Sequence, residues 1–181
     1  MNIFILNTGR CGSTTFIKAC QHITNYTSTH ESLSTCTGKL RLSYPINHIE
    51  ADNRLSWFLG RLDEKYPGAF YVHLTRNPRD TIKSFSKREN FGIIKAYKEG
   101  ILLGGEDNQS SHDIAADYIH TVESNINYFL KDKTDKMYFK LETAVDDFKV
   151  FWKTISAEGN LNAALAEWSI NYNKSTNKIE K

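Results

Sequence analysis

The chain has 181 residues, of which 40% are apolar and 12% aromatic. This length suits a single domain over residues 1–181, and this composition supplies a hydrophobic core and excludes a disordered or collagen-like chain. The 23 Lys and Arg residues nearly balance the 21 Asp and Glu residues, and the formal charge is only +2. That charge is too small for a general nucleic-acid binder, whose affinity needs a broad basic face, so any anion must be bound at a local site.

The cysteines and the apolar segments indicate the compartment. Cys11, Cys20 and Cys36 are odd in number and have no CxxC spacing, so neither a disulfide framework nor a metal site is favoured. The N-terminal segment lacks the basic region and the long apolar stretch of a signal peptide. No stretch approaches the roughly 18 apolar residues of a membrane span. We therefore expect a protein of the reducing cytoplasm, with no membrane and no nucleic-acid partner.

In its first part the sequence predicts two strands separated by a helix. Residues 3–6 are an unbroken apolar run, the pattern of a strand buried on both faces of a parallel sheet. A glycine-containing turn over 7–13 leads into a predicted helix over 14–23, and a short β-prone segment over 26–29 follows. Residues 32–50 are rich in Ser and Thr. We expect them to form an irregular loop, and loops of such length in compact domains are usually functional.

The remaining elements continue this alternation. Asp52 is expected to cap a helix whose apolar residues recur at helical spacing as far as Pro67, and residues 69–74 form a second apolar strand. Pro78 suits the first turn of a helix that runs through Arg88. Further on, the pattern predicts a long amphipathic helix at about 112–131, a strand at 137–141, and helices near 143–156 and 160–173.

Strands separated by helices predict a three-layer α/β/α domain with a central, mostly parallel sheet of about four to five strands. In such a fold the ligand site lies at the carboxyl ends of the strands. The most polar segments, 7–15, 30–31 and 75–88, all follow predicted strands at that edge. We therefore expect one site to be built from these three segments.

The first of these segments has the composition of a phosphate-binding turn. Its sequence GRCGSTT offers successive backbone N–H groups, hydroxyls and an arginine at a helix N-terminus, a P-loop-like arrangement that holds anions; an ordinary glycine turn is the plain alternative. A Walker A loop needs a lysine after its second glycine, whereas Ser13 follows Gly12. The aspartate that usually holds magnesium is also missing after strand 69–74, where Thr75 and Arg76 follow, so a nucleotide kinase or GTPase is disfavoured.

Together, residues 7–15 and 74–84 resemble the sulfotransferase family that uses 3′-phosphoadenosine 5′-phosphosulfate (PAPS). The run Arg10-Cys11-Gly12-Ser13-Thr14 resembles the family's 5′-phosphosulfate loop, and Arg76 with Ser84 eight positions later resembles its 3′-phosphate motif. The resemblance implies a P-loop-like sulfotransferase fold, PAPS as donor, 3′,5′-bisphosphoadenosine (PAP) as product, and no metal. The donor-binding residues that it implies are Gly9, Arg10, Cys11, Gly12, Ser13, Thr14, Thr15, Arg76 and Ser84.

The resemblance also implies catalytic roles. Arg10 stands where the family has the loop lysine or arginine that stabilises charge on the leaving oxygen. Cys11 would contribute its backbone N–H, although a helix N-terminus can also activate a thiol. The acceptor hydroxyl or amine loses a proton as it attacks sulfur, so a general base is expected. Glu31 is the candidate and His30 the alternative, while a polar surface turn is the plain interpretation of both.

The sequence leaves the acceptor open. A small molecule or a carbohydrate fits, and the aromatic residues Tyr44, Trp57, Phe91 and Tyr97 either line its pocket or belong to the core. Two other functions remain alternatives to the sulfotransferase. One is a P-loop kinase or nucleotide hydrolase, and the other is a non-catalytic nucleotide-binding module.

Overall fold

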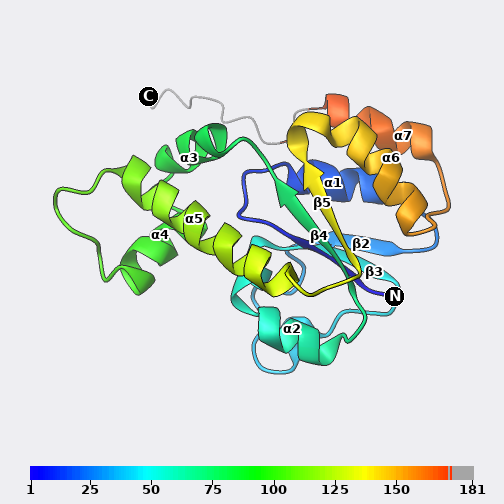
Figure 1. Cartoon of the computed structure of the whole chain (residues 1–181), viewed down its shortest axis with the longest axis horizontal. Helices are drawn as coiled ribbons and strands as arrows, with labels where there is room; N and C mark the ends of the chain where they lie inside the picture. The colour runs from blue at the N-terminus through cyan, green and yellow to red at the C-terminus, as the bar shows by residue number, and fades with distance from the viewer. Residues whose placement is uncertain (171, 173–181) are drawn as a thin grey trace.

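The computed structural model describes residues 1–170 and Tyr172, so the end of the predicted domain and of the predicted helix 160–173 lies outside the described residues. Five strands form one sheet in the order β2-β3-β1-β4-β5, and every neighbouring pair is parallel (Figure 1). The predicted α/β class and central parallel sheet are therefore confirmed. The strands are β1 (Ile3–Leu6), β2 (Thr27–His30), β3 (His48–Ala51), β4 (Phe70–Thr75) and β5 (Lys136–Lys140).

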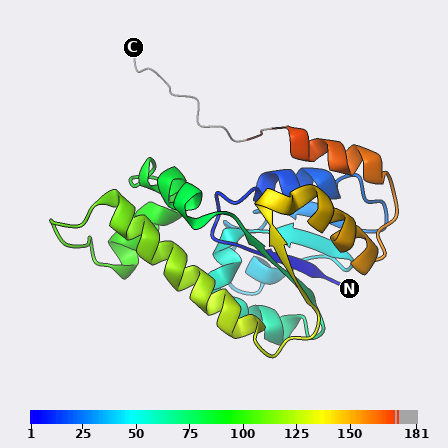
Figure 2. The same ribbon diagram turned by 45° about the horizontal axis from the view of Figure 1, so that its top comes forward.

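Helices cover both faces of this sheet. In Figure 2, α1, α6 and α7 lie on one side, and α5 and α2 lie on the other. The α-helices are α1 (Ser13–Cys20), α2 (Leu59–Lys65), α3 (Pro78–Ser86), α4 (Gly92–Ala96), α5 (Ser111–Leu130), α6 (Ala144–Thr154) and α7 (Leu161–Ala166). Short helical turns connect them: η1 (Leu40–Leu42), η2 (Asn53–Trp57), η3 (Tyr97–Ile101), η4 (Leu141–Thr143) and η5 (Glu167–Ser169).

The central strand β1 is buried on both faces, as its apolar run predicts. Ile3 and Ile5 belong to the hydrophobic layer under α1, α6 and α7, whereas Phe4 and Leu6 belong to the layer under α2 and α5. This division follows from the two-residue period of a strand, which directs successive side chains to opposite faces. The two layers hold the sheet rigid beneath its carboxyl edge.

Strand β3 corrects the prediction of an irregular loop over 32–50. The sequence did not predict this strand, because a central strand normally has a continuous run of apolar residues, whereas His48 and Glu50 are polar. Both side chains are nevertheless buried, because Glu50 accepts hydrogen bonds from Thr29 Oγ1 (2.5 Å), Ser32 N (2.9 Å) and Ser32 Oγ (2.7 Å) and lies 3.2 Å from His48 Nε2. Burial alone would raise the pKa of Glu50, but these hydrogen bonds outweigh it and the pKa is lowered.

Two further differences concern the helices. The predicted helix after Asp52 is divided into η2 and α2 at Phe58, although the Asp52 carboxylate does cap it by accepting from the Arg54 N–H at 2.8 Å. The segment between α3 and α5, for which no element was predicted, contains α4 and η3. None of the helices in the described part of the chain has the length and apolarity needed to cross a membrane.

The layer under α1, α6 and α7 is centred on aromatic rings, so it can be tested by truncation. Phe139 is fully buried, with its ring centroid 5.0 Å from that of Phe16. Phe139→Ala is expected to lower the free energy of unfolding by about 3–5 kcal/mol, because it removes a large buried ring. Tyr138→Ala, at the neighbouring exposed position, is the control and should cost no more than about 0.5 kcal/mol. Urea denaturation measures both, and equal losses would contradict the assigned core.

Candidate active site

The loop between β1 and α1 is held in a left-handed backbone conformation. Gly9, Arg10 and Gly12 have φ values of 88°, 59° and 94°, which glycine adopts readily and other residues rarely. A Cβ on Gly12 would lie 2.7 Å from Leu141 Cδ1, so this position also requires glycine for space. The N-cap residue of α1 is Gly12, which has no side chain to cap the helix. Its first backbone N–H groups therefore suit an anion.

This loop lies where the connections from the sheet change direction. The strand β1 has β3 on one side and β4 on the other, and the chain visits the β3 side before it crosses to β4. In parallel α/β sheets such a point opens a crevice outside the strand ends. Arg10 follows β1 and Arg76 follows β4, so their backbones meet at this crevice.

Arg10 contacts both of the other residues of the predicted donor motifs. The Arg76 Nη1 donates to the carbonyl oxygen of Arg10 at 3.3 Å, and the Arg10 Nε donates to the Ser84 Oγ at 3.0 Å. Ser84 lies on α3, which begins at Pro78. Arg10 therefore joins two segments that lie more than 60 residues away in sequence.

Arg10, Arg76 and Arg88 line a cavity of about 490 Å³, which we call the first cavity. Burial lowers the pKa of Arg10, and the positive charges of Arg88 and Arg76 lower it further. Because each guanidinium disfavours its neighbours' charge, an anion bound between them would be stabilised by all three. The sequence did not distinguish Arg88 from the other cations of its segment, and Arg88 lies in the turn that follows α3.

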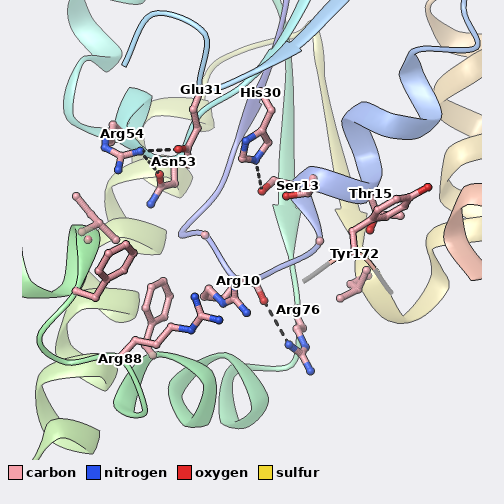
Figure 3. A pocket seen from close by; sticks show the side chains of 18 of the residues that line it. Arg10, Ser13, Thr15, His30, Glu31, Asn53, Arg54, Arg76, Arg88 and Tyr172 are labelled. Carbon is pink, nitrogen blue, oxygen red and sulfur yellow. Dashed lines mark hydrogen bonds and ion pairs between the residues drawn. The ribbon is translucent and has the colours of Figure 1, made fainter. Parts of the chain in front are cut away.

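The candidate bases lie across the first cavity from these arginines (Figure 3). His30 ends β2, and its Nε2 is 3.0 Å from the Ser13 Oγ of the loop. Glu31 follows with a φ of 53°, and its Oε2 is 3.1 Å from the Arg54 Nη1. The two side chains thus point to different partners: His30 to the phosphate-binding loop and Glu31 to the opposite end of the cavity.

The other loop residues are placed as follows. Gly9, Gly12, Ser13, Thr14 and Thr15 line the first cavity. Cys11 instead points into the core, with its Sγ 3.5 Å from the Asn7 Oδ1, and burial raises the pKa of its thiol to about 12. The thiol is therefore not activated by the helix N-terminus, and only the backbone of Cys11 is available to a ligand.

Asp52 corrects the prediction that the strands beside β1 are not followed by an aspartate. Thr75 and Arg76 do end and follow β4, but β1 has a second neighbour in β3, and Asp52 follows β3 directly. Its carboxylate is fully buried and accepts from Arg41 Nη2 at 2.6 Å and from Arg54 N at 2.8 Å. It is not among the described residues that line the first cavity. Within residues 1–170 and Tyr172, no group of three or more His, Cys, Asp or Glu side chains is arranged to hold a metal.

Apart from Phe91, the sequence did not indicate the apolar wall of the first cavity. This wall comes from distant segments, so no local pattern indicates it; it consists of Phe85, Phe91, Ile93, Leu141, Trp168, Ile170 and Tyr172. Phe91 is thus the one predicted pocket aromatic that lies here. Tyr44 is buried instead, with its ring stacked on His48 at 5.5 Å between centroids.

Comparison with known proteins shows what this fold resembles. A solved structure described as "Sulfotransferase Domain from the Curacin Biosynthetic Pathway" is similar over 89% of this chain and 75% of that chain, with a TM-score of 0.62 and 13% identity. No protein-family model and no curated protein matches the chain. The chain therefore has a sulfotransferase-like fold, with an all-parallel five-stranded sheet flanked by helices.

The burial of Cys11 predicts a pattern of thiol reactivity. At pH 8 a thiol with a pKa near 12 is ionised in roughly one molecule in ten thousand, and the thiolate is the reactive form. Cys20 is also buried with a raised pKa, whereas Cys36 is partly exposed. We expect iodoacetamide to alkylate Cys36 in the folded protein, and Cys11 and Cys20 only in urea, as read by peptide mass spectrometry. Equal labelling of Cys11 and Cys36 in the folded state would show that Cys11 is activated.

Proposed function

We propose that this protein is a PAPS-dependent sulfotransferase that transfers a sulfuryl group to an acceptor hydroxyl or amine. The observation that carries the proposal is the junction of Arg10, Arg76 and Ser84 at the carboxyl edge of a sulfotransferase-like sheet. Two strand ends thereby present fixed positive charge to one cavity, as a nucleotide with phosphates at both its 3′ and 5′ positions requires.

The donor would be held at two points. The loop after β1 and the first amides of α1 suit the 5′-phosphosulfate, because the first N–H groups of a helix have no acceptor within the helix. Arg76 suits the 3′-phosphate, and Arg88 adds a third guanidinium to the same cavity. Ser84 is not among the described residues that line this cavity, and its Oγ, which accepts from Arg10 Nε, is the second group proposed for the 3′-phosphate. The apolar wall at Leu141 and Trp168 offers a surface for the adenine ring.

The chemistry needs one proton acceptor and one stabiliser of negative charge. The acceptor oxygen forms a bond to sulfur while the bond from sulfur to the bridging phosphate oxygen breaks, and the electron pair leaves on that oxygen. Glu31 takes the proton from the attacking hydroxyl, and Arg10 stabilises the charge on the leaving oxygen. The Glu31 Oε2 is held by Arg54, and Oε1 has no hydrogen-bond partner among the described residues, so one oxygen is available to the acceptor.

His30 is the alternative base, but its position favours a different role. Its Nε2 is engaged by the Ser13 Oγ, so this imidazole supports the loop that would hold the transferring group. A base also has to reach the acceptor rather than the donor. Glu31, which points away from the loop towards Arg54, meets that requirement better.

The donor assignment predicts a nucleotide preference. By calorimetric titration, PAP should bind more tightly than ADP or ATP, with or without magnesium, because only PAP carries the 3′-phosphate. Arg76→Ala should weaken PAP binding by about 1.5–3 kcal/mol, the range for hydrogen bonds to charged groups. Arg79→Ala, an exposed position one turn away outside the cavity lining, is the matched control and should leave the affinity unchanged.

Three results would contradict this assignment. Equal binding of PAP and ADP would remove the need for a 3′-phosphate site, and magnesium-dependent preference for ATP would favour the kinase or hydrolase instead. PAP binding unaffected by Arg76→Ala would show that the motif has another role.

The base assignment predicts a separation of catalysis from binding. Glu31→Gln should lower kcat by about 10²–10⁴, the usual contribution of a general base, while the affinity for PAP remains that of the wild type. His30→Gln is the comparison, and it should lower the affinity for the donor more than it lowers kcat. The measurement is transfer of labelled sulfate from PAPS under saturating donor. The reverse pattern would assign the base to His30, and unchanged kcat in both variants would favour a non-catalytic module.

A further inference from the structure

A second cavity, of about 480 Å³, adjoins the first. Its walls come from the loop before η1, from the η2–α2 region and from α4 with η3. The rings of Trp57, Phe58 and Tyr97 and the side chain of Ile101 make much of this lining apolar. Trp57 and Ile101 are exposed. Two of the predicted pocket aromatics, Trp57 and Tyr97, therefore line this cavity and not the first one.

The two cavities meet at Arg54 and Ile93, which line both of them. Arg54 is also the residue that holds Glu31, as the dashed contact in Figure 3 shows. A molecule that fills the second cavity and extends past Arg54 therefore arrives at the carboxylate of Glu31. From there it faces the arginines across the first cavity.

The charged residues that line the second cavity are all basic. Three arginines line it, Arg41, Arg54 and Arg61, and none of the described lining residues is acidic. Arg41 forms an ion pair with the buried Asp52 at 2.6 Å, and Arg54 forms one with Glu31 at 3.1 Å. Arg61 differs from both.

Arg61 has no carboxylate partner within the described residues. Its Nη2 donates to the carbonyl oxygen of Gly38 at 2.8 Å, and its guanidinium lies over the Phe58 ring at 5.4 Å. These contacts orient the charge beside an aromatic ring without neutralising it. A carboxylate on a bound molecule could pair with it bidentately.

Building on the proposed function, we propose that the second cavity binds the acceptor, and that the acceptor is an apolar, ring-containing alcohol or phenol that carries a carboxylate. Its ring packs among Trp57, Phe58 and Tyr97, its carboxylate pairs with Arg61, and its hydroxyl extends past Arg54 to Glu31. A neutral sugar fits this cavity poorly, because burying its hydroxyls against an apolar wall leaves them without hydrogen-bond partners.

A matched pair of probes tests this proposal: 6-hydroxy-2-naphthoate and 2-naphthol, which differ only in the carboxylate. Binding is read without turnover, as protection of Cys36 from iodoacetamide, because Cys36 lines the second cavity. The naphthoate should protect Cys36 at a concentration at least about tenfold lower than the naphthol does. In the presence of PAPS it should also be the better acceptor by a similar ratio of kcat/KM.

Three variants assign the effect. Arg61→Gln should bring the two probes within about twofold of each other, while Lys65→Gln, an exposed change of charge on the same helix outside the lining, should keep the ratio. Ala96→Phe places a ring in the cavity from an exposed position on α4 and should abolish protection by both probes. PAP affinity should be unchanged in all three.

The outcomes separate this inference from the proposed function. If PAP binds but the naphthoate does not protect Cys36, or protects it no better than the naphthol, the acceptor assignment is wrong and the donor assignment stands. An unchanged ratio in Arg61→Gln, or equal transfer to a neutral methyl glycoside, also overturns it. If PAP does not bind at all, the proposed function fails, whatever the probes do at Cys36.

Discussion

The left-handed turn at the end of β1 is the constraint on which the rest of the site depends. Gly12 is pressed against Leu141, which follows β5, and a Cβ on Gly9 would lie 3.1 Å from Asn53 and 3.3 Å from Phe85. The turn is therefore in contact with segments that follow three other strands. Arg10 adopts a positive φ between these glycines, a conformation that costs energy in a residue with a side chain. Its carbonyl and its guanidinium are both engaged, by Arg76 and Ser84 respectively, so the strained residue is also the one that joins the two anion-binding motifs.

A buried carboxylate holds the opposite wall of the site. Glu50 accepts two hydrogen bonds from Ser32 and one from Thr29, residues on either side of His30 and Glu31. Because Glu50 lies on β3, in the interior of the sheet, it ties the end of the edge strand β2 to the rigid core. The left-handed conformation of Glu31 directs its side chain towards Arg54 and not along the strand. The position of the candidate base thus rests on a polar network whose centre, the Glu50 carboxylate, is fully buried.

The sequence predicted those parts of the fold and site in which local pattern and tertiary environment agree. Strand β1 is an unbroken apolar run, β4 is apolar except for His73 and Thr75, and the segment after each resembles an anion-binding motif, so Arg10, Arg76 and Ser84 were predicted together. Strand β3 was missed because its polar residues His48 and Glu50 are satisfied by each other and by Thr29 of the neighbouring strand β2, and a hydrogen-bond network between strands leaves no local signature. Asp52 and Arg54 were missed as site neighbours for the same reason, since their place beside β1 follows only once β3 is known. The apolar wall at Leu141 and Trp168 comes from packing between distant segments, which spacing along the chain does not encode.

The small net charge of the chain hides an uneven distribution that the fold creates. Arg41 and Arg54 form ion pairs with Asp52 and Glu31, and Arg76 lies 3.9 Å from Asp80. Arg10, Arg76 and Arg88 nevertheless line one cavity together. Such clustering raises the energy of the ligand-free protein, because desolvation and mutual repulsion both disfavour the charged form of Arg10. An anion bound at this cavity would offset that cost. Across the same cavity, the ion pair with Arg54 holds the Glu31 carboxylate at the junction of the two cavities. In the proposed reaction the Glu31–Arg54 pair therefore places the base where the acceptor arrives.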